Sequence, residues 1–112
     1  MGKWQNEAEQ RFRNLDCLRQ AERSLEQEIE NLPGRGKRMQ RQLRQVQCQV
    51  EILEQALQTL TPEERLVAEY MLINPQRGNV QQLCSILGLE RASIYRRRNR
   101  VVRKLSLALF GQ

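Results

Sequence analysis

The fold is decided by one stretch, residues 80–96, which reads VQQLCSILGLERASIYR. Its first part is a short apolar helix pattern that ends at Gly88, and glycine takes the positive φ of a helix C-terminus most easily. Leu89 is expected to pack in the angle between two helices. Ile94 then points the second helix back onto Leu83. This layout is typical of a helix-turn-helix.

A further helix is predicted directly before this motif. Thr61 is placed as its N-cap, Pro62 as its first residue, and Glu64 as the residue that closes a capping box. This helix is expected to run to Ile73 and to end in the breaker cluster at residues 74–78.

Two boundaries complete the C-terminal half. Asn79 is expected to cap the helix that precedes Gly88, and the last helix is expected to open at Glu90 or Arg91 and to run to about Leu109. Residues 61–112 are therefore predicted to form a three-helix helix-turn-helix domain.

The first half of the chain predicts two long helices. From Trp4 to Leu32 apolar residues recur at helical spacing without Gly or Pro, and a turn is expected where Pro33 and Gly34 follow. From Met39 the apolar residues alternate steps of four and three, which is a heptad seam. The seam consists of Met39, Leu43, Val46, Val50, Leu53, Leu57 and Leu60. Residues 1–60 therefore read as a long, coiled-coil-like αα-hairpin, and the fold class as all-α.

The partner of this seam is open at the level of sequence. Two such helices can simply pack within one chain. A two-helix hairpin buries little apolar area for its length, however, so we favour a homodimer joined through the hairpin. On this interpretation residues 1–60 are an arm for oligomerisation or for a partner.

The positive charge lies in the second half. Residues 1–60 carry a net charge of +1 and residues 61–112 carry +5, and no acid interrupts the arginine-rich run from Arg91 to Lys104. Arginine suits phosphates and base edges because its guanidinium group is a rigid fork of donors. A dense basic run of this kind indicates a nucleic-acid partner.

A helical wheel of the last helix separates a core side from a basic side. Val101, Leu105 and Ala108 share the side of Ile94, and Tyr95 is interpreted as a packing residue at its edge. Residues predicted to contact DNA bases are Arg91, Ala92 through its methyl group, Ser93 and Arg96. Residues predicted to contact phosphates are Arg97, Arg100, Arg103 and Lys104. The alternative is a solvated, arginine-rich face that only keeps the protein soluble.

Several segments also resemble a known family. The segments are LTPEERLVAEY at 60–70, CSILGL at 84–89, SIYR at 93–96 and KLSLAL at 104–109. Together, over roughly residues 57–111, they resemble the RinA and ArpU group of phage late-gene transcriptional activators, whose C-terminal part is similar to region 4 of sigma factors. The resemblance implies a phage or prophage activator that binds double-stranded promoter DNA and contacts RNA polymerase. It also places Arg91, Ala92 and Arg96 toward the groove.

Other function classes are disfavoured. The chain has no histidine, which removes the commonest general base and metal ligand, so we expect no enzyme activity, no metal and no cofactor. No apolar segment is long enough for a membrane span or a signal peptide, so a reducing cytoplasm is the expected setting. Two alternatives to a transcription regulator stay open. One is a small terminase-like subunit that recognises phage DNA for genome packaging, and the other is an adaptor that binds helices and RNA or acidic proteins.

Overall fold

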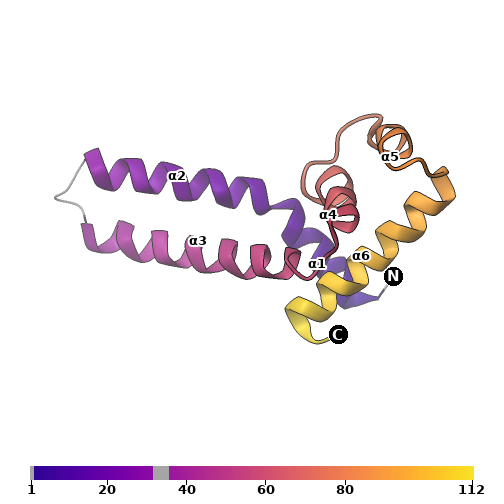
Figure 1. Cartoon of the computed structure of the whole chain (residues 1–112). Coiled ribbons are helices and arrows are strands. Elements are labelled where there is room, and N and C mark those ends of the chain that lie inside the picture. The colour runs from indigo at the N-terminus through magenta and orange to yellow at the C-terminus, as the bar shows by residue number, and fades with distance from the viewer. Residues whose placement is uncertain (1, 32–35) are drawn as a thin grey trace.

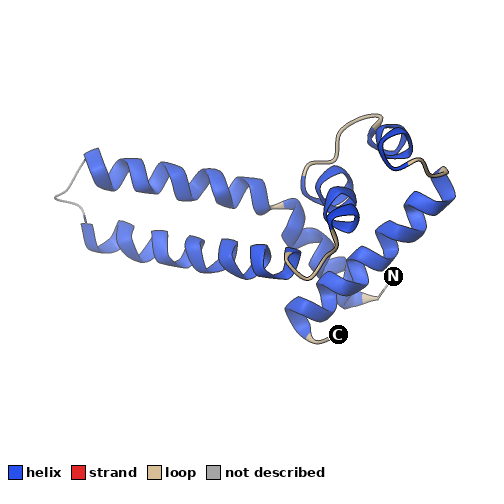
Figure 2. Cartoon of the chain, viewed as in Figure 1, coloured by secondary structure: helices blue, strands red, loops and turns tan. Residues whose placement is uncertain are grey.

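The computed structural model describes residues 2–31 and 36–112, and within these ranges every regular element is helical (Figures 1 and 2). The elements are α1 (Lys3–Arg13), α2 (Leu15–Asn31), α3 (Gly36–Leu57), α4 (Pro62–Ala68), the π-helical turn η2 (Glu69–Ile73), α5 (Asn79–Leu87) and α6 (Arg91–Phe110). The predicted all-α class is confirmed, with a long helix pair followed by the C-terminal helices. The turn expected at Pro33 and Gly34 lies outside the described residues.

The molecule is elongated because α2 and α3 project from the other helices as a hairpin (Figure 1). Its extents are 55 × 29 × 20 Å and its radius of gyration is 16.6 Å, against about 13 Å for a compact domain near this length. Arg19 and Glu54 form an ion pair across the hairpin, with 3.3 Å between Nε and Oε1.

The heptad seam is used within the chain for much of its length. Val50, Leu53 and Leu57 are buried, and so is Leu60, which follows the end of α3 in the turn and donates its N–H to the carbonyl of Leu57. Met39, Leu43 and Val46 are only half-buried. Pairing of the hairpin with a second copy stays a prediction.

The prediction of one helix from Trp4 to Leu32 is wrong, because the chain breaks at Asn14. Asn14 has φ −90° and ψ −2°, and it ends α1 before α2 begins at Leu15. The break turns α1 onto α6, where the Trp4 and Phe110 rings lie 5.1 Å apart. Phe12 and Leu15, on the two sides of the break, are both fully buried.

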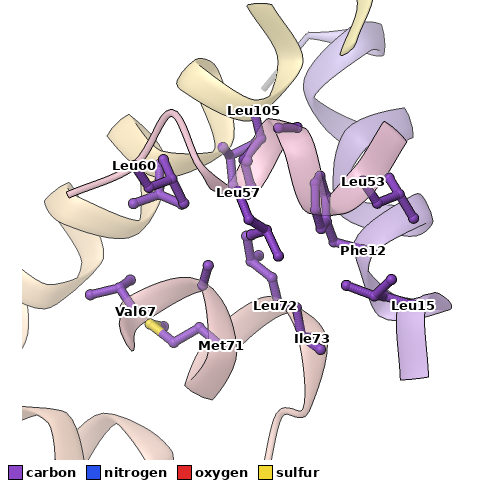
Figure 3. Close-up of a cluster of buried hydrophobic side chains, with 14 of the residues drawn as sticks. Phe12, Leu15, Leu53, Leu57, Leu60, Val67, Met71, Leu72, Ile73 and Leu105 are labelled. Carbon is purple, nitrogen blue, oxygen red and sulfur yellow. The ribbon is translucent and has the colours of Figure 1, made fainter. Parts of the chain in front are cut away.

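One continuous core joins the two halves of the chain. Figure 3 shows Leu57 and Leu72 meeting near its centre with Phe12 beside them, and Leu105 of α6 belongs to the same cluster. The core therefore crosses the domain boundary expected at residue 60. The base of the hairpin and α1 pack on the same apolar residues as the C-terminal helices.

The start of α4 follows the prediction. The Thr61 Oγ1 accepts the Glu64 N–H at 3.3 Å, and the Glu64 Oε1 accepts the Thr61 N–H at 2.9 Å, which completes the capping box with Pro62 at the first turn. Reciprocal bonds of this kind satisfy donors that a helix start otherwise leaves open. The start of α4 is thereby stabilised by residues of its own first turn.

The end of this helix differs from the prediction. Residues Glu69–Ile73 form a π-helical turn, in which the Asn74 N–H reaches back to the Glu69 carbonyl at 3.0 Å. The wider turn accompanies the burial of three consecutive residues, Met71, Leu72 and Ile73, which an α-helix would spread around its circumference.

The expected cap of α5 also needs correction. Gly78, with φ 77°, is the N-cap, and Asn79 is the first helical residue. The Asn79 side chain donates to the Tyr70 carbonyl at 2.9 Å and accepts the Val80 N–H at 2.8 Å. Asn79 therefore ties α5 to η2.

Candidate nucleic-acid interface

The helix-turn-helix consists of α5, a short turn and α6. Gly88 has φ 66° and ψ 35°, and its N–H bonds the Cys84 carbonyl at 2.9 Å, as the sequence predicts for the end of α5. Leu83 and Ile94 are fully buried in the shared core, and Leu89 packs against it. The opposite side of α6 therefore faces outward, and packing in the core holds the helix in this orientation.

The buried side of α6 is broader than the wheel predicts and is turned toward α1. Val102 and Ser106 are fully buried beside the expected Ile94, Val101 and Leu105. Ala108 is exposed, so its assignment to the core is wrong. The physical reason is α1, because it packs along α6 and covers a flank that the sequence leaves open.

The residues predicted to contact bases lie at the outward start of α6. Arg91, Ala92 and Arg96 are exposed, and Ser93 is half-buried. The Arg96 guanidinium donates to the Ser93 hydroxyl at 3.3 Å. These four side chains share the free end of the helix, beyond the part that α1 covers.

Tyr95 stands beside them rather than in the core. Tyr95 remains 45% exposed although Val102, two turns further along the same side of α6, is fully buried. The interpretation of Tyr95 as a packing residue is therefore wrong. Val102 lies between Arg98 and Phe110, which both contact α1, whereas Tyr95 lies nearer the start of α6.

The predicted phosphate contacts divide into two kinds. Arg100 and Arg103 are exposed, and neither forms an ion pair within residues 2–31 and 36–112. Arg97 instead pairs with Glu63, and Lys104 pairs with Glu64 at 2.8 Å. Two of the four predicted contacts are thus already engaged by carboxylates at the start of α4.

Arg98 is engaged on the other flank. It pairs with Glu9 of α1, and the two side chains are only 21% and 19% exposed. Burial lowers the pKa of the Arg98 guanidinium, and the facing carboxylate supplies the compensating charge. This pair fastens α1 to α6. Glu9 and Glu63 have no local signal in the sequence, because both act on residues far along the chain.

Glu64 is the most buried carboxylate of this region. Burial opposes its charge and by itself raises the pKa, but the hydrogen bonds with Lys104 and Thr61 outweigh burial, so the pKa lies below its ordinary value of 4.5. A group whose pKa is lowered by folding stabilises the fold above its unfolded pKa. That stabilisation is lost as the pH falls below about 4.5 and passes the folded pKa.

The free energy of unfolding should report this pair. We expect the wild type to be more stable than Glu64→Gln near neutral pH, with the difference shrinking as the pH falls below about 4.5. Urea unfolding over a pH series measures it, with Glu26→Gln on the exposed surface of α2 as the matched control. A difference that stays constant with pH would contradict the assigned role of the Glu64 carboxylate.

Two other kinds of site are absent from the described residues. Over residues 2–31 and 36–112, no three His, Cys, Asp or Glu side chains come together as metal ligands. No helix in these ranges is both long and apolar enough to cross a membrane. Comparison of the chain with family models, with curated proteins and with solved structures finds no match in any of the three.

Proposed function

We propose that this protein binds double-stranded DNA through α6 and regulates transcription at a promoter. The observation that carries the proposal is the exposed arginine face of α6, opposite the buried Ile94. Arg96, Arg100 and Arg103 lie along this face, and Arg91 is exposed at the first residue of the helix. A helix with its side chains is about 10–12 Å wide, which matches a major groove of about 12 Å.

The roles within this face follow from the chemistry of DNA. Arginine forks onto the O6 and N7 atoms of guanine, and a methyl group such as that of Ala92 suits thymine. Arginines further along the helix meet phosphates, which position the protein without reading the sequence. In this proposal Arg96 reads a base, while Arg100 and Arg103 hold the backbone.

The resemblance to phage late-gene activators supports a promoter as the target and RNA polymerase as a further partner. The projecting hairpin fits an accessory regulator, because an arm of this kind has no counterpart in sigma region 4. In a homodimer joined through the hairpin, two α6 helices would read half-sites separated by one turn of DNA, about 34 Å, or a multiple of it.

A binding selection on genomic fragments tests the proposal, followed by a salt titration of the best fragment against scrambled DNA. We expect one enriched sequence whose affinity exceeds that for scrambled DNA by at least about 10³-fold. Equal, steeply salt-dependent binding to every fragment would refute sequence-specific regulation. A ring of many chains that selects a single genome end would favour the packaging alternative.

A further inference from the structure

A small polar pocket lies between the start of α4 and the middle of α6. Its volume is about 230 Å³, and it is lined by Thr61, Glu64, Arg97, Arg100 and Lys104. Three cationic side chains and one hydroxyl thus surround a space with a single carboxylate in its wall. Glu63 adds a second carboxylate through its pair with Arg97.

The two ion pairs at this pocket differ in how firmly they are held. Glu64 is 10% exposed and also accepts the Thr61 N–H, so its pair with Lys104 belongs to the fold. Arg97 and Glu63 are 34% and 56% exposed, and exposed pairs of this kind contribute little to stability. The Arg97–Glu63 pair is therefore the one that can open.

Three donors remain for a ligand once this pair opens. Arg97 is released, and Arg100 forms no ion pair in the described part of the chain. The Thr61 hydroxyl accepts the Glu64 N–H and keeps its own proton to donate. Two guanidinium groups and a hydroxyl are a donor set that suits a phosphate.

We infer that this pocket seats one phosphate of the DNA backbone, and that Glu63 competes with the phosphate for Arg97. The inference rests on the proposed function and deepens it. Arg100 is four residues from Arg96 and three from Arg103, so it shares their helix surface and also reaches the pocket. When α6 lies in the groove, its flanks meet the phosphates on either side, and the start of α4 comes over one strand.

This arrangement lowers the contribution of Arg97 to DNA affinity. In the free protein the Glu63 carboxylate already neutralises Arg97, so contact with a phosphate exchanges one anion for another. Fewer counterions are then released from the DNA than the number of basic residues predicts. Glu63 therefore lowers the affinity for DNA of any sequence, and it leaves the base contacts of Arg96 unaffected.

The first test uses duplex DNA and a double-mutant comparison. Glu63→Gln should bind scrambled DNA more tightly and steepen the dependence of log K on log salt by about 0.9, as for one more neutralised phosphate. The same change in an Arg97→Ala background should have no effect on the slope. Glu69→Gln, an exposed carboxylate in η2, controls for net charge and should shift neither quantity by a comparable amount. A slope change that persists without Arg97 would overturn the inference while leaving DNA binding intact.

The second test needs no DNA and uses inorganic phosphate as the probe. Phosphate should raise the melting temperature of Glu63→Gln more than that of the wild type, relative to chloride at equal ionic strength. Arg97→Ala and Arg100→Ala should abolish the gain. If phosphate raised the melting temperature but the protein bound no DNA, the proposed function would be refuted and the pocket would still be an anion site. No response in Glu63→Gln, together with an unchanged DNA salt slope, would refute the pocket.

Discussion

Replacing Phe12 with alanine is expected to lower the free energy of unfolding by about 3–5 kcal/mol, a large part of the stability of a small protein. Phe12 is fully buried and lies in the same cluster as Leu57, Leu72 and Leu105. Removing its ring leaves a cavity where α1, α3 and the C-terminal helices meet. Because this core is continuous, the whole fold should unfold at lower denaturant concentration.

Two optical signals measure this effect. Trp4 is the only tryptophan and lies against Phe110, so its emission reports the docking of α1 on α6, while circular dichroism reports all helices. Both signals should shift to the same lower midpoint in Phe12→Ala. Ile52→Ala, at a side chain that is 52% exposed, should change stability by no more than about 0.5 kcal/mol. Loss of the Trp4 signal at an unchanged helical midpoint would show instead that α1 is an independent appendage.

Arg96→Ala is expected to weaken binding to the preferred DNA sequence by about 1–3 kcal/mol, or about 5-fold to 150-fold. Arg96 is exposed at the free end of α6, and its only bond to another side chain in the described residues is the one to Ser93. A bidentate contact with a base is lost when its side chain is removed, whereas scrambled DNA loses at most one electrostatic contact. The ratio of the affinities for preferred and scrambled DNA should therefore fall, by up to about 150-fold.

Arg100→Ala is the matched control, because it removes the same charge four residues away on the same face. It should weaken preferred and scrambled DNA alike and reduce the salt slope by about 1. Fluorescence anisotropy with both duplexes separates the two variants. If Arg96→Ala and Arg100→Ala behaved identically, Arg96 would be a backbone contact and sequence would be read elsewhere.

The sequence predicts those features that depend on residues a few positions apart. The capping box of Thr61 and Glu64 closes over one helical turn, and the left-handed Gly88 ends α5 by a bond to its own last turn. Their geometry is set by local backbone sterics and hydrogen bonding, which the residue types alone largely determine. The outward start of α6 follows for the same reason, because its direction depends on the turn at Gly88.

Features that depend on contacts between residues far apart in the chain could not be predicted from the sequence. No Gly or Pro marks the break at Asn14, and the bend lets α1 pack on α6 and η2, which lie far along the chain. Glu63 and Arg97 are 34 positions apart, and Glu64 and Lys104 are 40 apart, so nothing in either segment reveals the pairing. The division of the basic residues into engaged and open ones is thus a property of the fold.

The contact between α1 and α6 sets an order of events during synthesis. Glu9 and Arg98 are 89 positions apart, so the first helix leaves the ribosome several seconds before its partner exists, at typical rates of about 5–20 residues per second. The hairpin of α2 and α3, whose contacts are closer in sequence, can form in the meantime. α1 is therefore among the last helices to complete its contacts, and until α6 emerges the surface of α1 that packs on α6 stays open to solvent.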